Sequence, residues 1–269
     1  MAYVTVITGG AGGMGLDIAK RLGKETKLLI ADFQKHRIDI AKQELFGWDA
    51  EFVLMDCKDM DAVKALAAQA QEMGEVKYVI HAAGITDVTE LKRNTAEEIM
   101  KNNVFGVTNM MKVFTDIICD GGCIVNIASM TSYCDLQFKA FADGMEPALN
   151  GDYSKLLSFA NGSPSSAYSA SKSYMRWLTL RYISKVSQRG ARIVSVSPGV
   201  VWTPITYALE DCAPGSIKGF AYVTPVGRNG YASDVGQTVE FVCHQPFING
   251  CDILLDGGYY NAGDFDQID

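Results

Sequence analysis

Short uncharged runs alternate with longer amphipathic segments along most of the chain. The first run, residues 3–7, is rich in β-branched side chains, which is typical of a strand buried on both faces. A helix follows over 16–23, with Ile18, Ala19 and Leu22 on its apolar side. The same pattern predicts strands over 3–7, 27–31, 51–55, 76–80, 122–128, 192–197 and 251–255.

Further helices are predicted between these strands, over 35–46, 59–73, 95–117, 166–188 and 232–244. Helices that alternate with buried strands join parallel neighbours through crossover connections. We therefore expect one doubly wound α/β domain over 1–269, with a seven-stranded parallel sheet and helices on both faces. No break in composition divides the chain.

Three stretches depart from the pattern. Residues 133–165 contain no strand signal but many apolar side chains, which predicts short helices over a strand end. Whether they form a lid or an oligomer surface stays open. Residues 204–224 look irregular and are predicted to be a substrate loop, because irregular segments near a pocket can order over a ligand. The acidic tail, 259–269, is expected to be loose.

Composition and charge narrow the possible partners. The net charge of −7 and the isoelectric point near 5.0 argue against a nucleic-acid surface. No apolar run reaches the ~18 residues of a membrane span, and we expect no signal peptide. The seven scattered cysteines, without a histidine cluster, predict reduced thiols in a cytoplasmic protein and no metal site.

A glycine-rich turn joins the first strand to the first helix. Gly10, Gly12 and Gly15 have the spacing of a dinucleotide-binding turn. Glycines allow the backbone to approach a pyrophosphate, and the N-terminus of a helix favours an anion. The order strand, turn, helix favours this interpretation over a merely flexible turn.

Carboxylates end the second and third strands. Asp32 is placed to accept hydrogen bonds from the adenosine ribose and to repel a 2′-phosphate, which favours NAD over NADP. Lys35, His36 and Arg37 follow closely and weaken that preference. A helix-capping role for Asp32 stays open, and Asp56 could either meet the adenine amino group or cap the next helix.

Tyr168 and Lys172 are one helical turn apart and so share a face of the predicted helix 166–188. A tyrosine with a pKa of ~10 is a poor base at neutral pH, and a nearby cation lowers that pKa. Reaching a pKa of about 7 needs roughly 4 kcal/mol. The pair can therefore act as a general acid/base, although its spacing alone also fits a solvated helix face.

Other polar residues occupy apolar surroundings. Asn103 lies on the apolar side of its helix and needs partners, whereas Asn102 fits a solvated position. Ser129 ends the fifth strand. For His81, at the end of the fourth strand, we favour a hydrogen bond to the backbone of the turn over a catalytic role.

These motifs together resemble the short-chain dehydrogenase/reductase family over essentially the whole chain. The matching parts are Thr8-Gly9-x-x-x-Gly13-x-Gly15, Asp32, Asn103-x-x-Gly106, Ser129, Tyr168-x-x-x-Lys172 and Pro198-Gly199. The resemblance implies a Rossmann fold and an NAD-dependent oxidoreductase that interconverts a secondary alcohol and a ketone.

The resemblance also implies a role for each matching residue. Tyr168 is the expected acid/base, and Lys172 is expected to lower the pKa of Tyr168 and to hold the nicotinamide ribose. Ser129 is expected to bind the reacting oxygen, Asn103 a water that links Lys172 to solvent, and Thr203 the carboxamide. The expected cofactor contacts are Gly9, Gly12, Gly13, Met14, Gly15, Asp32, Asp56, Cys57, Ala82, Ala83, Gly84, Asn103, Tyr168, Lys172, Pro198, Gly199, Val201 and Thr203.

Two departures from the family pattern bear on the substrate. His81-Ala82-Ala83-Gly84 stands where the family commonly has Asn-Asn-Ala-Gly. The 39 positions from Ser129 to Tyr168 exceed the usual gap, so most of 133–165 resembles the insertion of a bacterial 3α-hydroxysteroid dehydrogenase/carbonyl reductase subgroup. This implies a hydroxysteroid substrate, such as a bile acid.

The alternatives are a non-steroid substrate (a xenobiotic carbonyl, a polyol or a fatty-acid-derived ketone) and a non-catalytic NAD-binding sensor or scaffold. We also expect a homo-oligomer, either a dimer or a tetramer. The extra segment could cover the helix surface through which the family usually dimerises, so the usual tetramer cannot be assumed.

Overall fold

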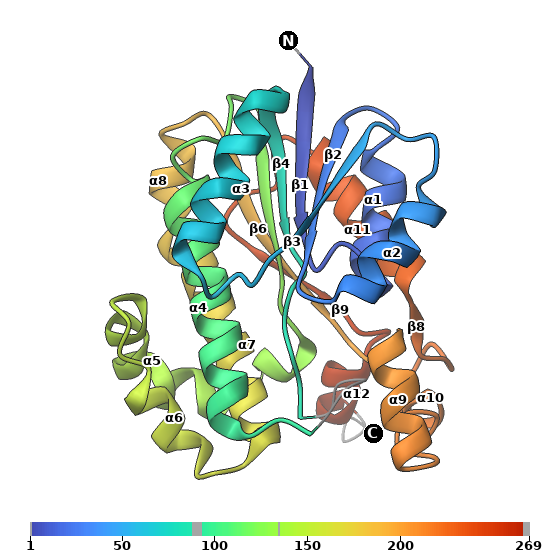
Figure 1. Ribbon diagram of the computed structural model, residues 1–269. Coiled ribbons are helices and arrows are strands. Elements are labelled where there is room, and N and C mark those ends of the chain that lie inside the picture. The colour runs from blue at the N-terminus through green and yellow to red at the C-terminus, as the bar shows by residue number, and fades with distance from the viewer. Residues whose placement is uncertain (1, 88–92, 134, 266–269) are drawn as a thin grey trace.

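The computed structural model describes residues 2–87, 93–133 and 135–265. Seven parallel strands form the central sheet in the order β3-β2-β1-β4-β5-β6-β9 (Figure 1). They are β1 (Tyr3–Thr8), β2 (Lys27–Asp32), β3 (Ala50–Leu54), β4 (Glu75–His81), β5 (Cys123–Ile127), β6 (Arg192–Pro198) and β9 (Asp252–Leu255). The predicted seven-stranded sheet is confirmed, with bounds that differ by one or two residues.

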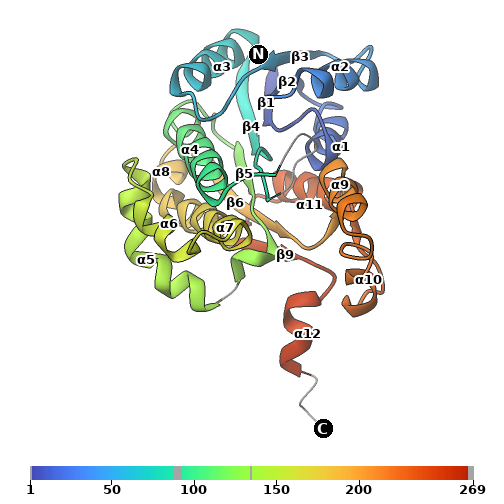
Figure 2. The ribbon, with the colours of Figure 1, turned by 60° about the horizontal axis from the view of Figure 1, so that its bottom comes forward.

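Helices cover both faces of the sheet (Figures 1 and 2). One face carries α1 (Gly13–Leu22), α2 (Lys35–Glu44) and α11 (Ala232–His244). The other carries α3 (Met60–Met73), α4 (Ala96–Phe114), α7 (Pro164–Arg181) and α8 (Ile183–Ser187). The predicted helix 166–188 thus divides at Tyr182, which ends α7 and precedes α8.

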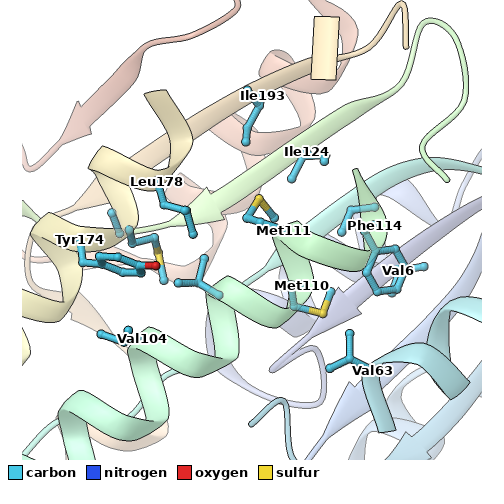
Figure 3. Close-up of a cluster of buried hydrophobic side chains, with 14 of the residues drawn as sticks. Val6, Val63, Val104, Met110, Met111, Phe114, Ile124, Tyr174, Leu178 and Ile193 are labelled. Carbon is cyan, nitrogen blue, oxygen red and sulfur yellow. The ribbon is translucent and has the colours of Figure 1, made fainter. Parts of the chain in front are cut away.

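Alternating side chains on each strand supply a separate core to each face. Val6 of β1 packs with the α3, α4 and α7 layer, whereas its neighbour Ile7 packs with the α1, α2 and α11 layer. In the first core, Phe114 and Met111 of α4 meet Ile124 of β5 (Figure 3). The two cores fix the strand ends on which the candidate site is built.

The segment after β6 is more regular than predicted. Residues 204–224 contain α9 (Pro204–Cys212) and α10 (Phe220–Val223), and a small parallel pair flanks them, β7 (Val201–Trp202) with β8 (Gly230–Tyr231). The Thr203 hydroxyl accepts a hydrogen bond from the Thr206 amide, and Pro204 occupies the first turn. A capped start with proline in the first turn is a helix signal that outweighs the glycines and prolines further on.

The expectation of a loose C-terminal tail is wrong for the described part, because Tyr259–Phe265 forms helix α12. The Asp256 carboxylate accepts hydrogen bonds from the amides of Gly258 and Tyr260 and so caps the helix start. The Tyr259 ring also packs against Phe220 of α10. The cap is local, whereas the contact with Phe220 joins residues far apart in the sequence.

The stretch before α7 forms the short 3₁₀ helix η1 (Met130–Tyr133), α5 (Asp135–Leu149) and α6 (Ser154–Ala160). Helix α6 packs against α5, α7 and α4, on the outer side of that layer (Figure 1). Among the described helices, none is long and apolar enough to cross a membrane.

Candidate active site

A cleft with about 750 Å³ of empty space, open solvent included, lies at the carboxyl ends of β1, β2 and β4. This is where the strand order reverses, the usual ligand position in an open α/β sheet. The predicted cofactor residues that line it are Gly9, Gly12, Gly13, Met14, Gly15, Asp32, Asp56, Cys57, Ala82, Ala83, Gly84 and Thr203. Phe33, Arg37 and Asn102 also line it and were not predicted to do so.

The glycine-rich turn fits a dinucleotide for steric reasons. Gly9 has φ +67°, and a Cβ on it would lie 2.7 Å from the Ala83 amide nitrogen. A Cβ on Gly15 would lie 2.2 Å from the carbonyl oxygen of Gly9. Only glycine fits either position, and the bare backbone leaves the amides at the start of α1 open to a pyrophosphate.

Asp32 lies at the end of β2, inside the cleft and almost fully buried. Burial raises the pKa of its carboxyl group, while the Gln34 amide, which donates to Asp32 at 3.0 Å, and the charge of Arg37 oppose the rise. Gln34 is the residue that caps α2, so Asp32 also steadies the helix start. Asp32 is therefore not the N-cap itself: it binds the amide of the N-cap residue and stays inside the cleft.

Asp56 and Cys57 form the far wall of the cleft. Asp56 accepts a hydrogen bond from the Lys58 amide at 2.9 Å, whereas Asp59 is the residue that caps α3. The capping role considered for Asp56 therefore belongs to Asp59. Burial raises the pKa of the Cys57 thiol to about 12, so it stays protonated at neutral pH.

His81 bonds to a side chain, rather than to the backbone as expected. Its Nδ1 lies 2.8 Å from the Thr8 hydroxyl, because Thr8 and His81 are paired at the ends of neighbouring strands. Burial lowers the pKa of His81 to about 3, so the ring is neutral in the folded protein.

We expect His81 to make the fold sensitive to acid. The unfolded chain binds a proton on His81 below a pKa of about 6.5, whereas the folded chain does so only near 3. Stability from this residue is present above pH 6.5 and is lost as the pH falls, by about 2 kcal/mol between pH 7 and 5. Urea unfolding at both pH values checks this: His81→Asn should lose about 2 kcal/mol less than the wild type. Equal losses would contradict it.

A second cavity, with about 1050 Å³ of empty space when open solvent is included, adjoins the first at Met14, Ala82, Gly84 and Thr203. Ser129, Tyr168 and Lys172 lie on its wall, with the predicted residues Pro198, Gly199 and Val201. Its other walls are largely apolar, formed by Ile85, Met130, Val200, Ile205, Leu209, Ile217 and Phe220. Residues 142–165, the part of the segment before α7 whose side chains the structure describes, do not line it.

Ser129 and Tyr168 meet at this cavity. The Ser129 hydroxyl hydrogen-bonds the phenol of Tyr168 and opposes the effect of burial on its pKa. It also accepts hydrogen bonds from the amide and hydroxyl of Thr131, at 3.2 and 3.1 Å. With its lone pairs engaged by Thr131, its own proton is available to an oxygen in the cavity.

Lys172 lies one turn further along α7 and is buried. Its ammonium donates to the Ile127 carbonyl at 2.8 Å and lies 5.7 Å from the centre of the Tyr168 ring. Burial lowers the pKa of Lys172 to about 8. The pKa of Tyr168, by contrast, is raised by burial, which is opposite to the direction expected from Lys172. Loss of water around the phenol is the largest cause of the raised pKa, and the charge of Asp87 adds to it.

Asn103 lies behind the site rather than on its wall. Its amide oxygen accepts from the Ile85 amide at 2.9 Å, and its amide nitrogen donates to the Ile85 carbonyl and to the Ser171 hydroxyl. A Cβ on Gly84 would lie 3.4 Å from both Asn103 Oδ1 and Lys172 Nζ, so the two groups face the same small space. Asn103 therefore fixes the loop after β4 against α7.

The family is decided by comparison with known proteins. A family model described as short chain dehydrogenase matches residues 3–140, more than half of the chain. The chain belongs to the short-chain dehydrogenase/reductase family. A second model, described as enoyl-(acyl carrier protein) reductase, matches residues 153–260. The protein is therefore an oxidoreductase of alcohols and ketones, and its family binds a nicotinamide cofactor.

Relatives within this family differ in substrate. A galactitol 2-dehydrogenase of Cereibacter sphaeroides is 27% identical over 94% of this chain and 93% of its own. A 3beta-hydroxysteroid dehydrogenase 2 of Eggerthella lenta is 26% identical over 94% and 93%. The solved structure of ElxO with NADP bound aligns with a TM-score of 0.75 at 21% identity, covering 97% of this chain and 100% of that one.

Helices α9 and α10 of this short-chain dehydrogenase lie in the predicted substrate loop and line the second cavity, and we call residues 204–223 the lid. The sequence did not single out the residues that hold the lid in place. Glu210 of α9 is buried, and its carboxylate accepts hydrogen bonds from the amides of Gly215, Ile217 and Lys218, at 2.8, 2.9 and 3.1 Å. The Gly215 amide contributes most to lowering the pKa of Glu210. Asn229 holds the Ile217 carbonyl as well. These bonds fix Ile217 and Phe220 against the cavity.

Replacing Glu210 with glutamine should therefore loosen the lid. A neutral amide is a weaker acceptor for three N–H groups than a carboxylate. We expect KM for the alcohol to rise several-fold with kcat changed by less than about twofold, because Tyr168 and Ser129 lie on other elements. Steady-state kinetics at saturating cofactor give both constants. Exposed Asp211→Asn, the next residue of α9, is the control, and a fall in kcat at constant KM would contradict this role.

Proposed function

We propose that the protein is an NAD(H)-dependent hydroxysteroid dehydrogenase, with a bile acid as one example of its substrate. The observation that carries the proposal is the apolar cavity of about 1050 Å³ beside Ser129 and Tyr168. Small-molecule pockets are lined in this way, mostly by hydrophobic side chains with a few polar groups that orient the ligand. A steroid nucleus would pack against the apolar walls, while one of its hydroxyls reaches Ser129 and Tyr168.

The character of these walls argues against a polyol. Besides Ser129, Tyr168 and Thr203, which lie next to the cofactor cleft, the side-chain hydroxyls on these walls come from Thr86, Thr131 and Thr206. Thr131 and Thr206 are already bonded to neighbouring residues. A sugar alcohol would leave several hydroxyls without partners, at about 1–3 kcal/mol each. A steroid leaves few such groups, which agrees with the name of the Eggerthella relative.

The proposed mechanism moves a proton at the polar end of the cavity. A bound nicotinamide supplies or accepts the hydride. The raised pKa of Tyr168 keeps the phenol protonated at neutral pH, the form that donates to a carbonyl oxygen. Ser129 donates to the same oxygen. Lys172, held by the Ile127 carbonyl, presents its remaining protons toward the cavity, and Asn103 fixes the adjoining loop. The water expected beside Asn103 stays a prediction.

NAD is proposed over NADP because Asp32 is a buried carboxylate inside the cleft. A 2′-phosphate next to it would meet a like charge. Arg37 lines the same cleft, so the preference depends on the balance between these two side chains. The homo-oligomer and the cytoplasmic location stay predictions, as does the likeness of 133–165 to the 3α-hydroxysteroid dehydrogenase subgroup.

The test is NADH formation, followed by absorbance, with a panel of 3-, 7-, 12-, 17- and 20-hydroxysteroids, fatty-acid-derived alcohols and polyols. We expect turnover with at least one hydroxysteroid. Turnover only of polyols or fatty-acid-derived alcohols would replace the steroid assignment with one of the alternative substrates. If no member of a wide panel reacts while NAD binds tightly, the non-catalytic binding protein becomes the better account.

A further inference from the structure

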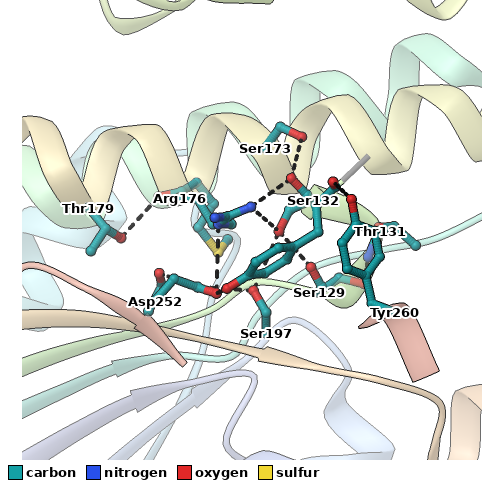
Figure 4. Close-up of polar contacts among 12 residues, drawn as sticks. Ser129, Thr131, Ser132, Ser173, Arg176, Thr179, Ser197, Asp252 and Tyr260 are labelled. Atoms are coloured by element: carbon teal, nitrogen blue, oxygen red, sulfur yellow. Dashed lines mark hydrogen bonds and ion pairs between the residues drawn. The ribbon is translucent and has the colours of Figure 1, made fainter. Parts of the chain in front are cut away.

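A buried polar network holds the turn that carries Ser129. We call residues 129–133 the serine turn. The Ser132 hydroxyl donates to the Ser129 carbonyl at 2.6 Å, and Arg176 donates to the Ser132 carbonyl at 2.8 Å (Figure 4). Arg176 lies on α7, four residues after Lys172, so the helix that carries Lys172 also holds the serine turn.

Asp252 is the centre of this network. Its side chain is 8% exposed, at the start of the edge strand β9. It accepts hydrogen bonds from the Tyr133 hydroxyl at 2.6 Å, from Ser197 at 3.0 Å and from Ser195. Arg176 Nε lies 3.7 Å from the same carboxylate (Figure 4).

Asp252 and Arg176 do more than neutralise each other's charge, because both also hold Tyr133. The Arg176 guanidinium lies 3.7 Å from the centre of the Tyr133 ring, so Asp252 and Arg176 hold Tyr133 at its hydroxyl and at its face. Removing one member of a buried ion pair leaves the other without a partner, which is costly. The serine turn is therefore held from α7 and from β9 at once.

The C-terminal helix reaches the same turn. The Tyr260 hydroxyl donates to the Tyr133 carbonyl, and the two rings lie 5.4 Å apart. The neighbouring Tyr259 packs on Phe220, which lines the substrate cavity. Helix α12 thus connects the serine turn to the lid.

We propose that Asp252, Arg176 and Tyr133 are positioning residues that fix Ser129 for proton transfer, with Tyr260 as a further support from α12. The inference rests on the proposed role of Ser129 in the reaction. None of the four touches the cavity: they act through the serine turn. A small displacement of Ser129 would weaken its hydrogen bond to the reacting oxygen without changing the cofactor cleft.

The primary test compares two matched tyrosine variants. Tyr133→Phe removes the hydroxyl that Asp252 accepts, whereas Tyr174→Phe removes a buried hydroxyl of α7 that pairs with Thr108 at 2.8 Å. Hydrogen–deuterium exchange reports directly on the serine turn, where the Thr131 and Ser132 amides are bonded to Ser129. We expect faster exchange in 129–133 for Tyr133→Phe and Asp252→Asn, and no change there for Tyr174→Phe.

A double-mutant cycle then asks whether the effect passes through Ser129. Tyr133→Phe should lower kcat by about tenfold when Ser129 is present. In the Ser129→Ala background the same change should lower kcat by less than about twofold, since the group being positioned is gone. KM for NAD should stay constant throughout, and Tyr174→Phe should have the same effect on kcat in both backgrounds.

Equal losses of kcat in the two backgrounds, or unchanged exchange in 129–133, would overturn the proposal and leave the network a purely structural role. If the wild-type enzyme turns over no alcohol or ketone at all, the proposed function fails by itself. The exchange measurement still decides whether Asp252 and Tyr133 hold the serine turn.

Discussion

Replacing Tyr168 with phenylalanine is expected to lower kcat by about a thousandfold, within the 10²–10⁴ range of general acid/base catalysis. The change removes one oxygen and keeps the ring that packs at the base of the cavity. Ser129 loses a partner but keeps its bonds to Thr131, so the site should retain its shape. Turnover of a responsive alcohol at saturating NAD measures the effect.

Binding of NADH separates this loss from damage to the fold. Its dissociation constant, from fluorescence titration, should change by less than about twofold in Tyr168→Phe, because the cofactor cleft is built mainly on β1, β2 and β4. A variant that keeps most of the wild-type kcat would show that another group moves the proton. A pure binding protein would be unaffected in both measurements.

Replacing Asp32 with serine is expected to shift cofactor preference toward NADP by at least about a hundredfold in the ratio of kcat/KM values. The substitution removes a like charge, a repulsion of several kcal/mol in a desolvated site. Arg37, in the same cleft, would then face a 2′-phosphate without the competing carboxylate. Kinetics with both cofactors give the ratio.

The double variant Asp32→Ser with Arg37→Ala tests the two halves of this argument. It should lose most of the gain with NADP, because the remaining cleft has no cation at Arg37 to balance the phosphate. Comparable kcat/KM with NAD and NADP in the wild-type protein would refute the role of Asp32 before any variant is made.

Local signals in the sequence were sufficient for the main fold. Helix α3 is an example: Val63, Leu66, Ala67 and Ala70 are buried as their spacing predicts. The glycine turn and Asp32 follow from strand ends and the Tyr168–Lys172 pair from helical spacing, whereas the role of Ser129 came from the family resemblance. The structure brings all of them to one edge of the sheet. Parallel strands make this possible, because their carboxyl ends share an edge.

What the sequence did not reveal depends on contacts between distant residues. Arg37 was noted only as a nearby charge, and its position over Gly12 follows from the packing of α2. Glu210 carries no local signal of its role, because its carboxylate binds amides of the loop after α9. Helix α12 is held by Tyr133 and Phe220, more than a hundred and about forty positions away, so no local pattern predicts it.

The raised pKa of Tyr168 was not predicted either, because it also depends on contacts between distant residues. The spacing to Lys172 predicts a lowered pKa for Tyr168, because an argument from spacing includes the nearby cation but not burial. Burial depends on the closed cavity around the phenol, and it dominates in the folded protein. Substrate preference was expected from 133–165 and from the substrate loop 204–224. The described cavity walls include 198–220, Tyr168 and Lys172 of α7, and the ends of β4 and β5.

The most direct measurement of the central claim is the ratio of kcat/KM for the best hydroxysteroid to that for galactitol, at saturating NAD on the wild-type protein. An apolar cavity with few unengaged hydroxyls predicts a ratio above about a hundred, because each unpaired polyol hydroxyl costs about 1–3 kcal/mol. A ratio below one, or no NADH formed from any hydroxysteroid, would contradict the assignment.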